Sequence, residues 1–209
     1  MKFLKFKKVL CLSPHPDDVE FGMMGSVLKY TDTHFDIVCL SSGGDFDDTT
    51  GKSRLKEMRG VWQNQINTTL HFTKFKLIKE LGHDAWVNHI ETLFTNKEEY
   101  DCLFVPTKED SHFEHKVVNE LAFPLTRIKG ISILEYRTPS TLDVWSPNTF
   151  TDITEYFDEK YDKLMLCDSQ KDRWYFQKDL LKSFHSNFQS YKKGIKYVEQ
   201  FKTIQLYKI

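Results

Sequence analysis

The sequence predicts an α/β fold built on a mostly parallel sheet. Three observations support this class: short apolar runs alternate with segments of helical periodicity, polar residues follow the ends of those runs, and 209 residues are enough to bury a sizeable core. Strands that alternate with helices form βαβ units, whose right-handed crossovers produce a parallel sheet. We therefore expect one domain spanning residues 1–209.

Five apolar runs are predicted as strands and four segments between them as helices. Continuous apolar runs are typical of strands buried on both faces, whereas apolar residues spaced three and four apart are typical of helices. The strands are expected at about 8–13, 35–41, 69–75, 102–106 and 131–136, and the helices near 20–30, 52–66, 85–95 and 114–125.

The alternation of strands and helices stops near residue 149. Beyond it, the pattern predicts helices over Ile153–Cys167 and Arg173–Tyr191 and a late strand within Lys196–Tyr207. No Gly-x-Gly-x-x-Gly segment follows the first predicted strand, so the sequence gives no support for a dinucleotide site.

Charge and cysteine usage narrow the class of protein. A formal net charge of −1 offers no broad attraction to nucleic acid or to an anionic membrane, so either partner would need a local charged patch. We expect no nucleic-acid partner and no membrane span. The apolar run behind the basic N-terminus stops at Ser13-Pro14, too early for a signal peptide or a membrane span. The cysteines lack disulfide or zinc spacing and suit buried positions in a reducing, cytoplasmic compartment; they are Cys11, Cys39, Cys102 and Cys167.

The segment His-Pro-Asp-Asp at 15–18 follows the first predicted strand directly. Imidazole and carboxylate are the ligands of a catalytic metal that keeps one position open for water, which suits His15 and Asp18. Asp17 lies between them and can take a proton from that water without being a ligand. The alternative is an acidic turn in which Asp17 or Asp18 only caps the following helix.

A second polar segment follows the strand predicted at 102–106. It carries His112 and His115, which are three residues apart and share a face at the start of a helix. His115 would complete a His-Asp-His site with His15 and Asp18. His112 would then polarise a scissile carbonyl or protonate a leaving amine, and Asp110 could orient a ring nitrogen. These residues predict a metal-dependent hydrolase.

The segments Ser13–Gly25 and Glu109–His115 resemble the PIG-L/LmbE-like family of zinc-dependent N-deacetylases. The resemblance implies a Rossmann-like three-layer sandwich, Zn²⁺ or another divalent metal such as Fe²⁺, and removal of an N-acetyl group from an amino sugar. It makes His15, Asp18 and His115 the metal ligands, Asp17 the general base, and His112 the residue that stabilises the oxyanion or assists the leaving amine.

Other segments extend the resemblance over nearly the whole chain. Ser41–Asp45 is similar to the family's polar glycine turn and Arg54–Glu57 to its Arg-x-x-Glu helix, while the C-terminal pattern is matched by 152–154, Lys160, Ser169-Gln170 and 194–201. The resemblance makes Arg54 a substrate-binding candidate, although it could simply pair with Glu57. Asp45 could bind sugar hydroxyls, or lie in an ordinary acidic loop.

The stretch 71–90 has little likeness to a well-characterised subgroup, so the substrate stays open. We expect an N-acetylated sugar or its conjugate as the small-molecule partner. Two alternatives are an amidase that cleaves a larger acyl group from an amino sugar and a non-catalytic carbohydrate- or nucleotide-binding module. The resemblance is compatible with a homo-oligomer, and no residue pattern decides it.

Overall fold

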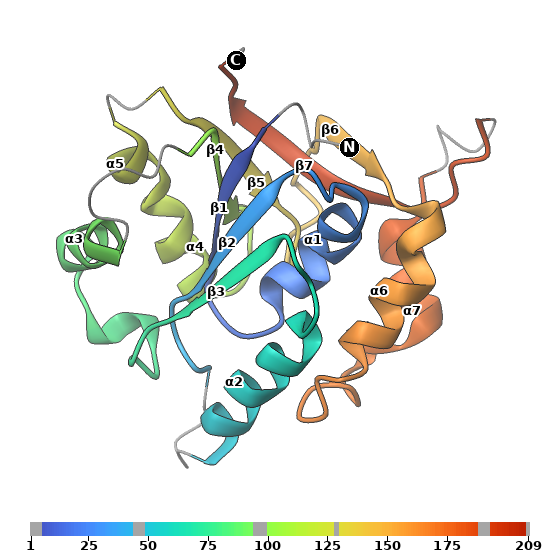
Figure 1. Cartoon of the computed structure of the whole chain (residues 1–209), viewed down its shortest axis with the longest axis horizontal. Coiled ribbons are helices and arrows are strands. Elements are labelled where there is room, and N and C mark those ends of the chain that lie inside the picture. The colour runs from blue at the N-terminus through green and yellow to red at the C-terminus, as the bar shows by residue number, and fades with distance from the viewer. Residues whose placement is uncertain (1–5, 44–48, 94–99, 128–129, 188–192, 208–209) are drawn as a thin grey trace.

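A computed structural model describes residues 6–43, 49–93, 100–127, 130–187 and 193–207. Within these ranges one sheet of seven strands has the order β3-β2-β1-β4-β5-β7-β6 (Figure 1). The strands are β1 (Lys8–Ser13), β2 (His34–Cys39), β3 (Thr68–Phe72), β4 (Cys102–Pro106), β5 (Ser132–Tyr136), β6 (Thr149–Asp152) and β7 (Val198–Gln205).

The first five strands are parallel, and the last two are antiparallel to their neighbours. Cys11 of β1 pairs with Ile37 of β2 on one side and with Phe104 of β4 on the other. The chain adds β2 and β3 on one side of β1 and then crosses over to add β4 and β5 on the opposite side. The order of strands therefore reverses between β1 and β4, where the carboxyl ends of strands open a crevice. The predicted α/β class with a mostly parallel sheet is confirmed.

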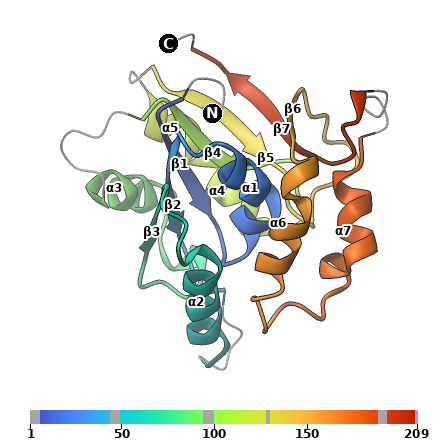
Figure 2. The ribbon, with the colours of Figure 1, turned by 45° about the vertical axis from the view of Figure 1, so that its right-hand side comes forward.

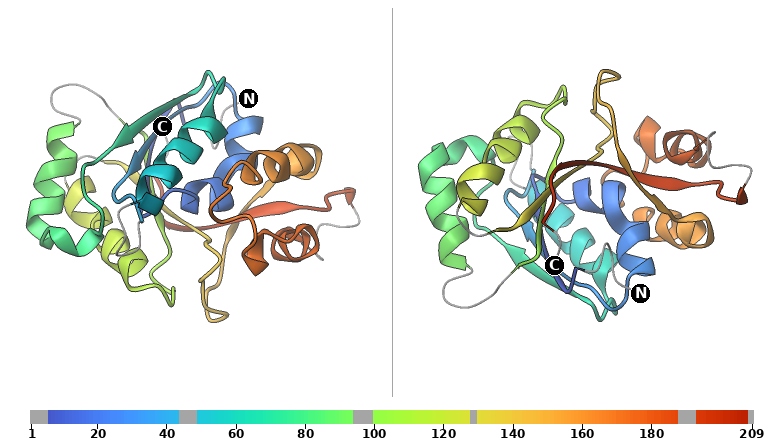
Figure 3. Two further views of the ribbon diagram at one scale, coloured as in Figure 1. Left: turned by 90° about the horizontal axis from the view of Figure 1, so that it is seen from below. Right: turned by 90° about the horizontal axis from the view of Figure 1, so that it is seen from above.

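Helices cover both faces of the sheet (Figure 3). One face carries α1 (Asp18–Lys29) and α2 (Thr49–Trp62), and the other carries α3 (His83–Leu93), α4 (Phe113–Glu120) and α5 (Ala122–Thr126). Cys11 packs in the apolar cluster of the first face and Leu12 in that of the second. This split arises because successive strand residues point to opposite faces.

The last two helices, α6 (Phe157–Leu164) and α7 (Lys178–His185), lie beyond α1 rather than on the parallel strands (Figure 2). Phe21 of α1 packs with Phe157, Phe176 and Leu181 in a separate buried apolar cluster. A helix close to so many elements needs small residues: a Cβ at Gly25 would lie 2.7 Å from the Ile153 side chain. The C-terminal segment therefore packs tightly on the helix that begins with Asp18.

A buried ion pair joins α6, β7 and α1. Lys160 Nζ lies 2.7 Å from Glu199 Oε1, and both side chains are fully buried. Lys160 also donates to the carbonyl of Phe21, and Glu199 accepts from the amides of Gly25 and Ser26 at 2.8 and 2.6 Å. Burial lowers the pKa of Lys160, and the charge of Glu199 opposes that effect. The pair thus satisfies its charges on each other and on the backbone of α1.

Several predicted bounds were wrong for identifiable reasons. The helix expected at 114–125 is divided into α4 and α5, because Pro124 has no amide to donate and its ring would clash with the carbonyl of Glu120. The helix expected from Ile153 begins with the 3₁₀ turn Thr154–Tyr156, and the one expected at Arg173–Tyr191 is the turn Trp174–Phe176 followed by α7, with 188–191 outside the described residues.

The short edge strand β6 was not predicted, because four residues carry too little periodicity. The late strand expected within Lys196–Tyr207 is confirmed as β7. All four cysteines are buried, as expected from their positions in the sequence. Across the described ranges, no helix combines the length and apolar character needed to cross a bilayer.

Replacing Lys160 with Met should lower the free energy of unfolding by about 3–5 kcal/mol, because it leaves the buried Glu199 charge unpaired. Urea denaturation of the variant measures this loss. Lys171→Met is the matched control, since its partner Asp168 lies at the surface, and it should leave the urea midpoint unchanged. A Lys160→Met protein as stable as the wild type would show that the pair does not hold α1 in place.

Candidate active site

The candidate site lies in the crevice between the carboxyl ends of β1 and β4. The turn after β1 supplies His15 and Asp17, and the start of α4, after β4, supplies His112 and His115. A cavity of about 420 Å³ opens there. Its walls come from seven parts of the chain and comprise His15, Asp17, Asp18, Phe21, Gly43, Arg54, Leu77, His112, Glu114, His115, Pro139, Ser140, Ser169, Gln170, Arg173, Tyr175 and Phe176.

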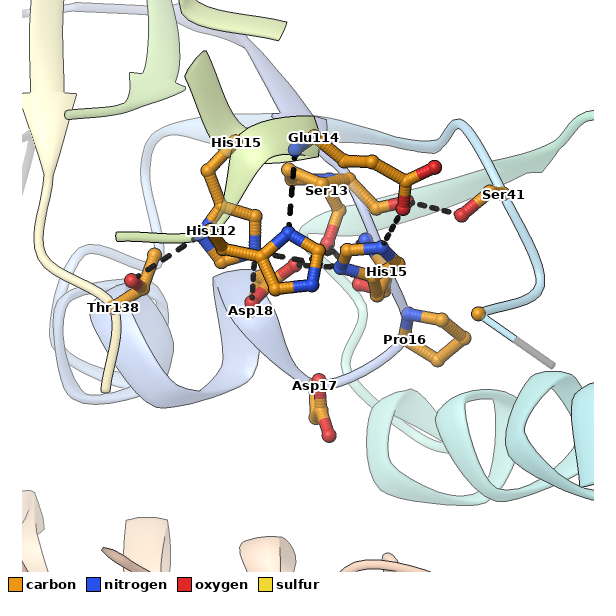
Figure 4. Close-up of polar contacts among 12 residues, drawn as sticks. Ser13, His15, Pro16, Asp17, Asp18, Ser41, His112, Glu114, His115 and Thr138 are labelled. Atoms are coloured by element: carbon orange, nitrogen blue, oxygen red, sulfur yellow. Dashed lines mark hydrogen bonds and ion pairs between the residues drawn. The ribbon is translucent and has the colours of Figure 1, made fainter. Parts of the chain in front are cut away.

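His15, Asp18 and His115 line this cavity and form a tight, buried cluster (Figure 4). Asp18 Oδ2 lies 3.2 Å from His15 Nδ1, and Asp18 Oδ1 lies 3.3 Å from His115 Nε2. The two ring nitrogens are themselves 3.4 Å apart. The structure therefore brings together the three side chains that the sequence predicted as metal ligands, with one nitrogen or oxygen of each facing the others.

Each histidine of the cluster is oriented by a carboxylate behind it. Glu114 Oε2 lies 2.6 Å from His15 Nε2, and Asp110 Oδ2 lies 3.0 Å from His115 Nδ1. Because an ionised carboxylate only accepts hydrogen bonds, the ring nitrogen that faces it, His15 Nε2 or His115 Nδ1, carries the proton. In a neutral ring the other nitrogen, which faces the cluster, is left with a lone pair. Carboxylates in this position fix the tautomer and orientation of metal-binding histidines.

Asp110 is held in turn by two hydroxyl groups from the loop after β5. Thr138 donates to Asp110 Oδ2, and Ser140 donates to Asp110 Oδ1 at 2.6 Å. The backbone amide of His112 also donates to Asp110 Oδ1, at 2.7 Å. The predicted role of Asp110 in orienting a ring nitrogen agrees with its contact with His115, and the same carboxylate fixes the backbone of His112.

The donor set fits a divalent cation. Two imidazole nitrogens and a carboxylate converge from buried side chains whose outer nitrogens are already satisfied. Burial lowers the pKa of His115, but the charge of Asp18 and the hydrogen bonds to Asp110 and Asp18 outweigh it and raise that pKa to about 10. The cluster therefore attracts positive charge strongly, either a proton or a cation.

His15, His112 and Glu114 form a second group whose donors lie close enough to hold a cation. In that group, however, His15 Nε2 is engaged by Glu114 at 2.6 Å, and His112 is exposed. The group with Asp18 and His115 has three buried donors instead. Among the described residues, Asp17 belongs to neither group.

Asp17 lies beside the cluster with a free carboxylate oxygen. Figure 4 shows its side chain pointing away from the rings of His15 and His115, and it lines the cavity. Oδ1 accepts from Arg54 at 3.2 Å, while the buried Oδ2 has no hydrogen-bond partner among the described residues. Burial raises the pKa of Asp17 to about 6, although Arg54 opposes this effect. A carboxylate with such a pKa and a free oxygen can exchange a proton near neutral pH.

The backbone at Asp17 is strained. Its φ of 109° lies in the left-handed region, which costs a residue with a side chain about 1–3 kcal/mol. The amide of Asp17 donates to Glu20 Oε2 at 3.1 Å, and Glu20 Oε1 accepts from the Trp62 indole at 2.6 Å. These bonds tie the turn to α1 and α2, so two helices stabilise a conformation that Asp17 would not adopt alone.

Arg54 reaches the site from α2. It donates to the carbonyls of Gly43 and Pro16 at 2.6 and 2.9 Å and to Asp17. Glu57, its expected alternative partner, accepts from Ser169 instead. Arg54 therefore supports the turn that carries the candidate base. Its predicted role in binding substrate stays a prediction, as does that of Asp45, which lies outside the described residues.

His112 forms the N-cap of α4. Its Nδ1 accepts from the amide of Glu114 at 3.3 Å, so a neutral ring carries its proton on Nε2. Burial and the neighbouring histidines lower its pKa, which favours the neutral form. The ring stacks on His115 with centroids 4.6 Å apart and lines the cavity.

Glu114 was missed in the sequence, although it lies between the two predicted histidines. Metal-binding histidines usually have an orienting carboxylate, but Glu114 orients His15 rather than its sequence neighbour His115, so its position in the sequence did not reveal this role. The wall residues Ser140, Arg173 and Tyr175 gave no local signal, and Gln170 was noted only as part of the Ser169-Gln170 match.

Comparison with known proteins identifies a family match over more than half of the chain. The family model described as PIG-L, GlcNAc-PI de-N-acetylase, matches residues 10–125. This range includes every member of the histidine and aspartate cluster. A diacetylchitobiose deacetylase of Thermococcus kodakarensis is 43% identical over 51 residues, a match that covers 24% of this chain and only 19% of that relative.

Solved structures share the fold over nearly the whole chain. The N,N'-diacetylchitobiose deacetylase of Pyrococcus horikoshii, in complex with its inhibitor MPG, aligns with a TM-score of 0.75 at 24% identity and covers 96% of this chain and 85% of its own. GalB of Pseudomonas putida, a 4-carboxy-2-hydroxymuconate hydratase, aligns with a TM-score of 0.69 at 15% identity and covers 97% of this chain and 98% of its own. At these identities the likeness concerns the fold alone.

Replacing Arg54 with Met should raise the pKa of Asp17 above its value of about 6, because a cation 3.2 Å from Oδ1 no longer favours the carboxylate. Carbon-13 NMR of labelled aspartates in metal-free protein measures this pKa. Arg59→Met on the same helix is the control, because the guanidinium of Arg59 stacks on the ring of Phe72 and does not face Asp17. An unchanged Asp17 pKa in the Arg54 variant would contradict this electrostatic assignment.

Proposed function

The chain belongs to the PIG-L family, the family of GlcNAc-PI de-N-acetylase, and from this membership and the geometry of the cavity we propose a metal-dependent N-deacetylase. Its substrate would be an N-acetylated amino sugar or a conjugate of one, cut by water into acetate and a free amine. One observation carries the proposal: a buried carboxylate with a free oxygen, Asp17, lies in the same cavity as a buried cluster of cation ligands without belonging to it.

His15, Asp18 and His115 would hold the cation. When bound, the metal supplies Lewis acidity that lowers the pKa of water and polarises a carbonyl group. Two nitrogens and one carboxylate suit Zn²⁺, and the same set accepts Fe²⁺. Glu114 and Asp110 keep both rings in the tautomer that such binding requires.

Asp17 would be the general base. Its Oδ2 is free to accept a proton from the attacking water, and a pKa of about 6 leaves the group ionised at neutral pH. Arg54 holds Oδ1, so the carboxylate keeps one orientation as it gains and loses the proton. Protonated Asp17 would then deliver that proton to the leaving amine, so that water and amide are converted into acetate and amine.

His112 would stabilise the oxyanion that forms on the acetamide carbonyl. The Glu114 amide engages Nδ1, so the neutral ring offers Nε2–H as a donor. A fixed donor aimed at developing negative charge is worth about 3–4 kcal/mol of transition-state stabilisation in a comparable site. The stacking of His112 on His115 limits how far the donor can move.

We expect Asp17→Asn to lower the rate of acetate release by about 100- to 10,000-fold while metal stays bound, because the amide cannot accept the proton of water. The assay measures acetate and free amine from N-acetylglucosamine and its glycosides, phosphates and lipid conjugates, with metal content determined in parallel. For the metal-loaded wild type, kcat should fall at acid pH, where Asp17 becomes protonated, and the midpoint should lie below the metal-free pKa of about 6 because the bound cation favours the carboxylate.

Other outcomes of this assay would change the assignment. Loss of the metal in Asp17→Asn would make Asp17 a ligand rather than the base. Release of a longer carboxylic acid, with no acetate, would indicate an amidase for larger acyl groups. Tight sugar binding without turnover in metal-loaded wild-type protein would indicate a binding module and refute the proposed activity.

Glu114→Gln and Asp110→Asn should each weaken metal binding about 10- to 100-fold, because each removes the carboxylate that orients a ligand histidine. Competition with a chromogenic chelator measures the Kd for Zn²⁺. Glu120→Gln, at the far end of the same helix, is the control and should bind Zn²⁺ as the wild type does. Unchanged affinity in both variants, with folding intact, would show that the metal does not use these two histidines.

A further inference from the structure

A second cavity of about 420 Å³ adjoins the candidate active site. The two cavities share Pro139, Ser140 and Tyr175 as wall residues, so they meet at the loop after β5 and the turn before α7. A substrate bound in the first cavity can therefore extend into the second without leaving the protein surface. The following inference rests on the proposed function, since it concerns what is attached to the sugar that is deacetylated.

Trp174 forms an exposed aromatic wall of this second cavity. Of the four tryptophans in the chain, Trp62, Trp86 and Trp145 are buried, whereas Trp174 is 58% exposed. Its ring contacts Tyr175 edge to face at 5.6 Å between centroids and lies 6.1 Å from Phe184. These contacts leave a large apolar surface open to solvent in a fixed place, beside a hydrolytic site.

The other walls of the second cavity combine polar side chains with the apolar Pro139 and Leu142, and they carry no positive charge. Its described wall residues include the hydroxyls of Ser111 and Thr141 and the exposed carboxylate of Asp143, and none of them is Lys, Arg or His. Asp143 would repel a phosphate or a carboxylate but can accept hydrogen bonds from hydroxyl groups. Arg173, the nearest cation in sequence to Trp174, lines the first cavity instead, where its charge lowers the pKa of Asp17.

The wall is also fixed relative to the catalytic residues. The amide of Ser111 donates to the carbonyl of Ser140 at 3.0 Å, and that of Leu142 donates to Glu109 at 2.9 Å. Ser140 additionally donates to Asp110, which orients His115. The wall of the second cavity therefore stays at a fixed distance from the residues that act on the N-acetyl group. A subsite for a second sugar linked to the first requires such a fixed distance.

We propose that the second cavity binds a neighbouring, uncharged pyranose ring of the substrate, with Trp174 as its stacking platform. The C–H face of a pyranose is apolar and packs on an aromatic ring, while its hydroxyl groups match Asp143, Thr141 and Ser111. The preferred substrate is then an N-acetylated disaccharide or longer neutral oligosaccharide, in preference to a monosaccharide or a phosphate-linked conjugate. Trp174 is a specificity-determining residue rather than a catalytic one.

The kinetic test compares kcat/KM for N-acetylglucosamine, N,N'-diacetylchitobiose and N-acetylglucosamine 1-phosphate. Trp174→Ala should lower kcat/KM for the disaccharide about tenfold and leave the other two within about twofold, because only the disaccharide covers the indole. Trp174→Phe, which keeps an aromatic face, should recover most of the loss. Phe123→Ala, an exposed aromatic residue on α5, is the matched control and should change none of the three values.

A binding test needs no turnover. Because Trp174 is the one exposed tryptophan, collisional quenching by acrylamide reports on it in particular. In metal-loaded Asp17→Asn, the disaccharide should protect the fluorescence from acrylamide and the monosaccharide should not. The protection should disappear when Trp174→Phe is added.

Equal loss of kcat/KM for all three sugars in Trp174→Ala, or a disaccharide that binds without protecting Trp174, would overturn the subsite. Wild-type protein that releases acetate from the monosaccharide as readily as from the disaccharide would also overturn it, with the deacetylase intact. Acetate release from no sugar, together with protection of Trp174 by the disaccharide, would instead refute the proposed reaction and leave the sugar subsite standing.

Discussion

The buried charge of Lys160 is the constraint on which the rest of the structure depends. A fully buried ammonium group must be neutralised, and Glu199 is the side chain that does so. Because the two residues come from α6 and β7 and both bond to the backbone of α1, the C-terminal segment can pack in one register only. That segment carries Gln170, Arg173 and Tyr175, which line the same cavity as His15, Asp18 and His115. One ion pair thus fixes the C-terminal part of the cavity wall to α1, the helix that begins with Asp18.

The chemistry of the cavity follows from an excess of carboxylates around two histidines. Asp18, Asp110 and Glu114 surround His15 and His115, and burial strengthens their attraction for positive charge. The same groups would repel a fourth carboxylate, so Asp17 is kept ionisable by Arg54 on its other side. The pKa of Asp17 is therefore a balance: burial and the charge of Asp18 raise it, whereas Arg54, His15 and Arg173 lower it. The two neighbouring aspartates therefore differ in protonation. Asp18, whose pKa lies well below the usual range, stays charged, whereas Asp17 can exchange a proton.

The parallel half of the sheet and the core of the site could be predicted from the sequence because their signals are local. Buried strands appear in the sequence as apolar runs. The polar residues directly after them, such as His15 and Asp18, lie at the carboxyl ends of parallel strands and therefore reach the crevice. Contacts made across the fold gave no local signal. Arg54 bonds to Asp17 from 37 residues away, Lys160 bonds to Glu199 at a separation of 39 residues, and Thr138 and Ser140 reach Asp110 from the loop after β5. The orienting role of Glu114 depends on its contact with His15, 99 residues away.

The fold by itself does not select the reaction, since a hydratase shares it with a TM-score of 0.69. What supports the proposed amide hydrolysis is the combination of a carboxylate with an unsatisfied oxygen, Asp17, and a neutral donor, His112, in the same cavity as a cluster of candidate cation ligands. Addition of water to an alkene would need the same activated water, but it leaves no amine to protonate and no tetrahedral oxyanion to stabilise. The substrate is determined elsewhere, by the loop after β5 and the turn before α7, which line both cavities. The loop after β5 holds Asp110 through Ser140, and Asp110 orients His115, so a change in this loop would disturb the ligands. We therefore propose that substrate choice depends on Trp174, in the turn before α7.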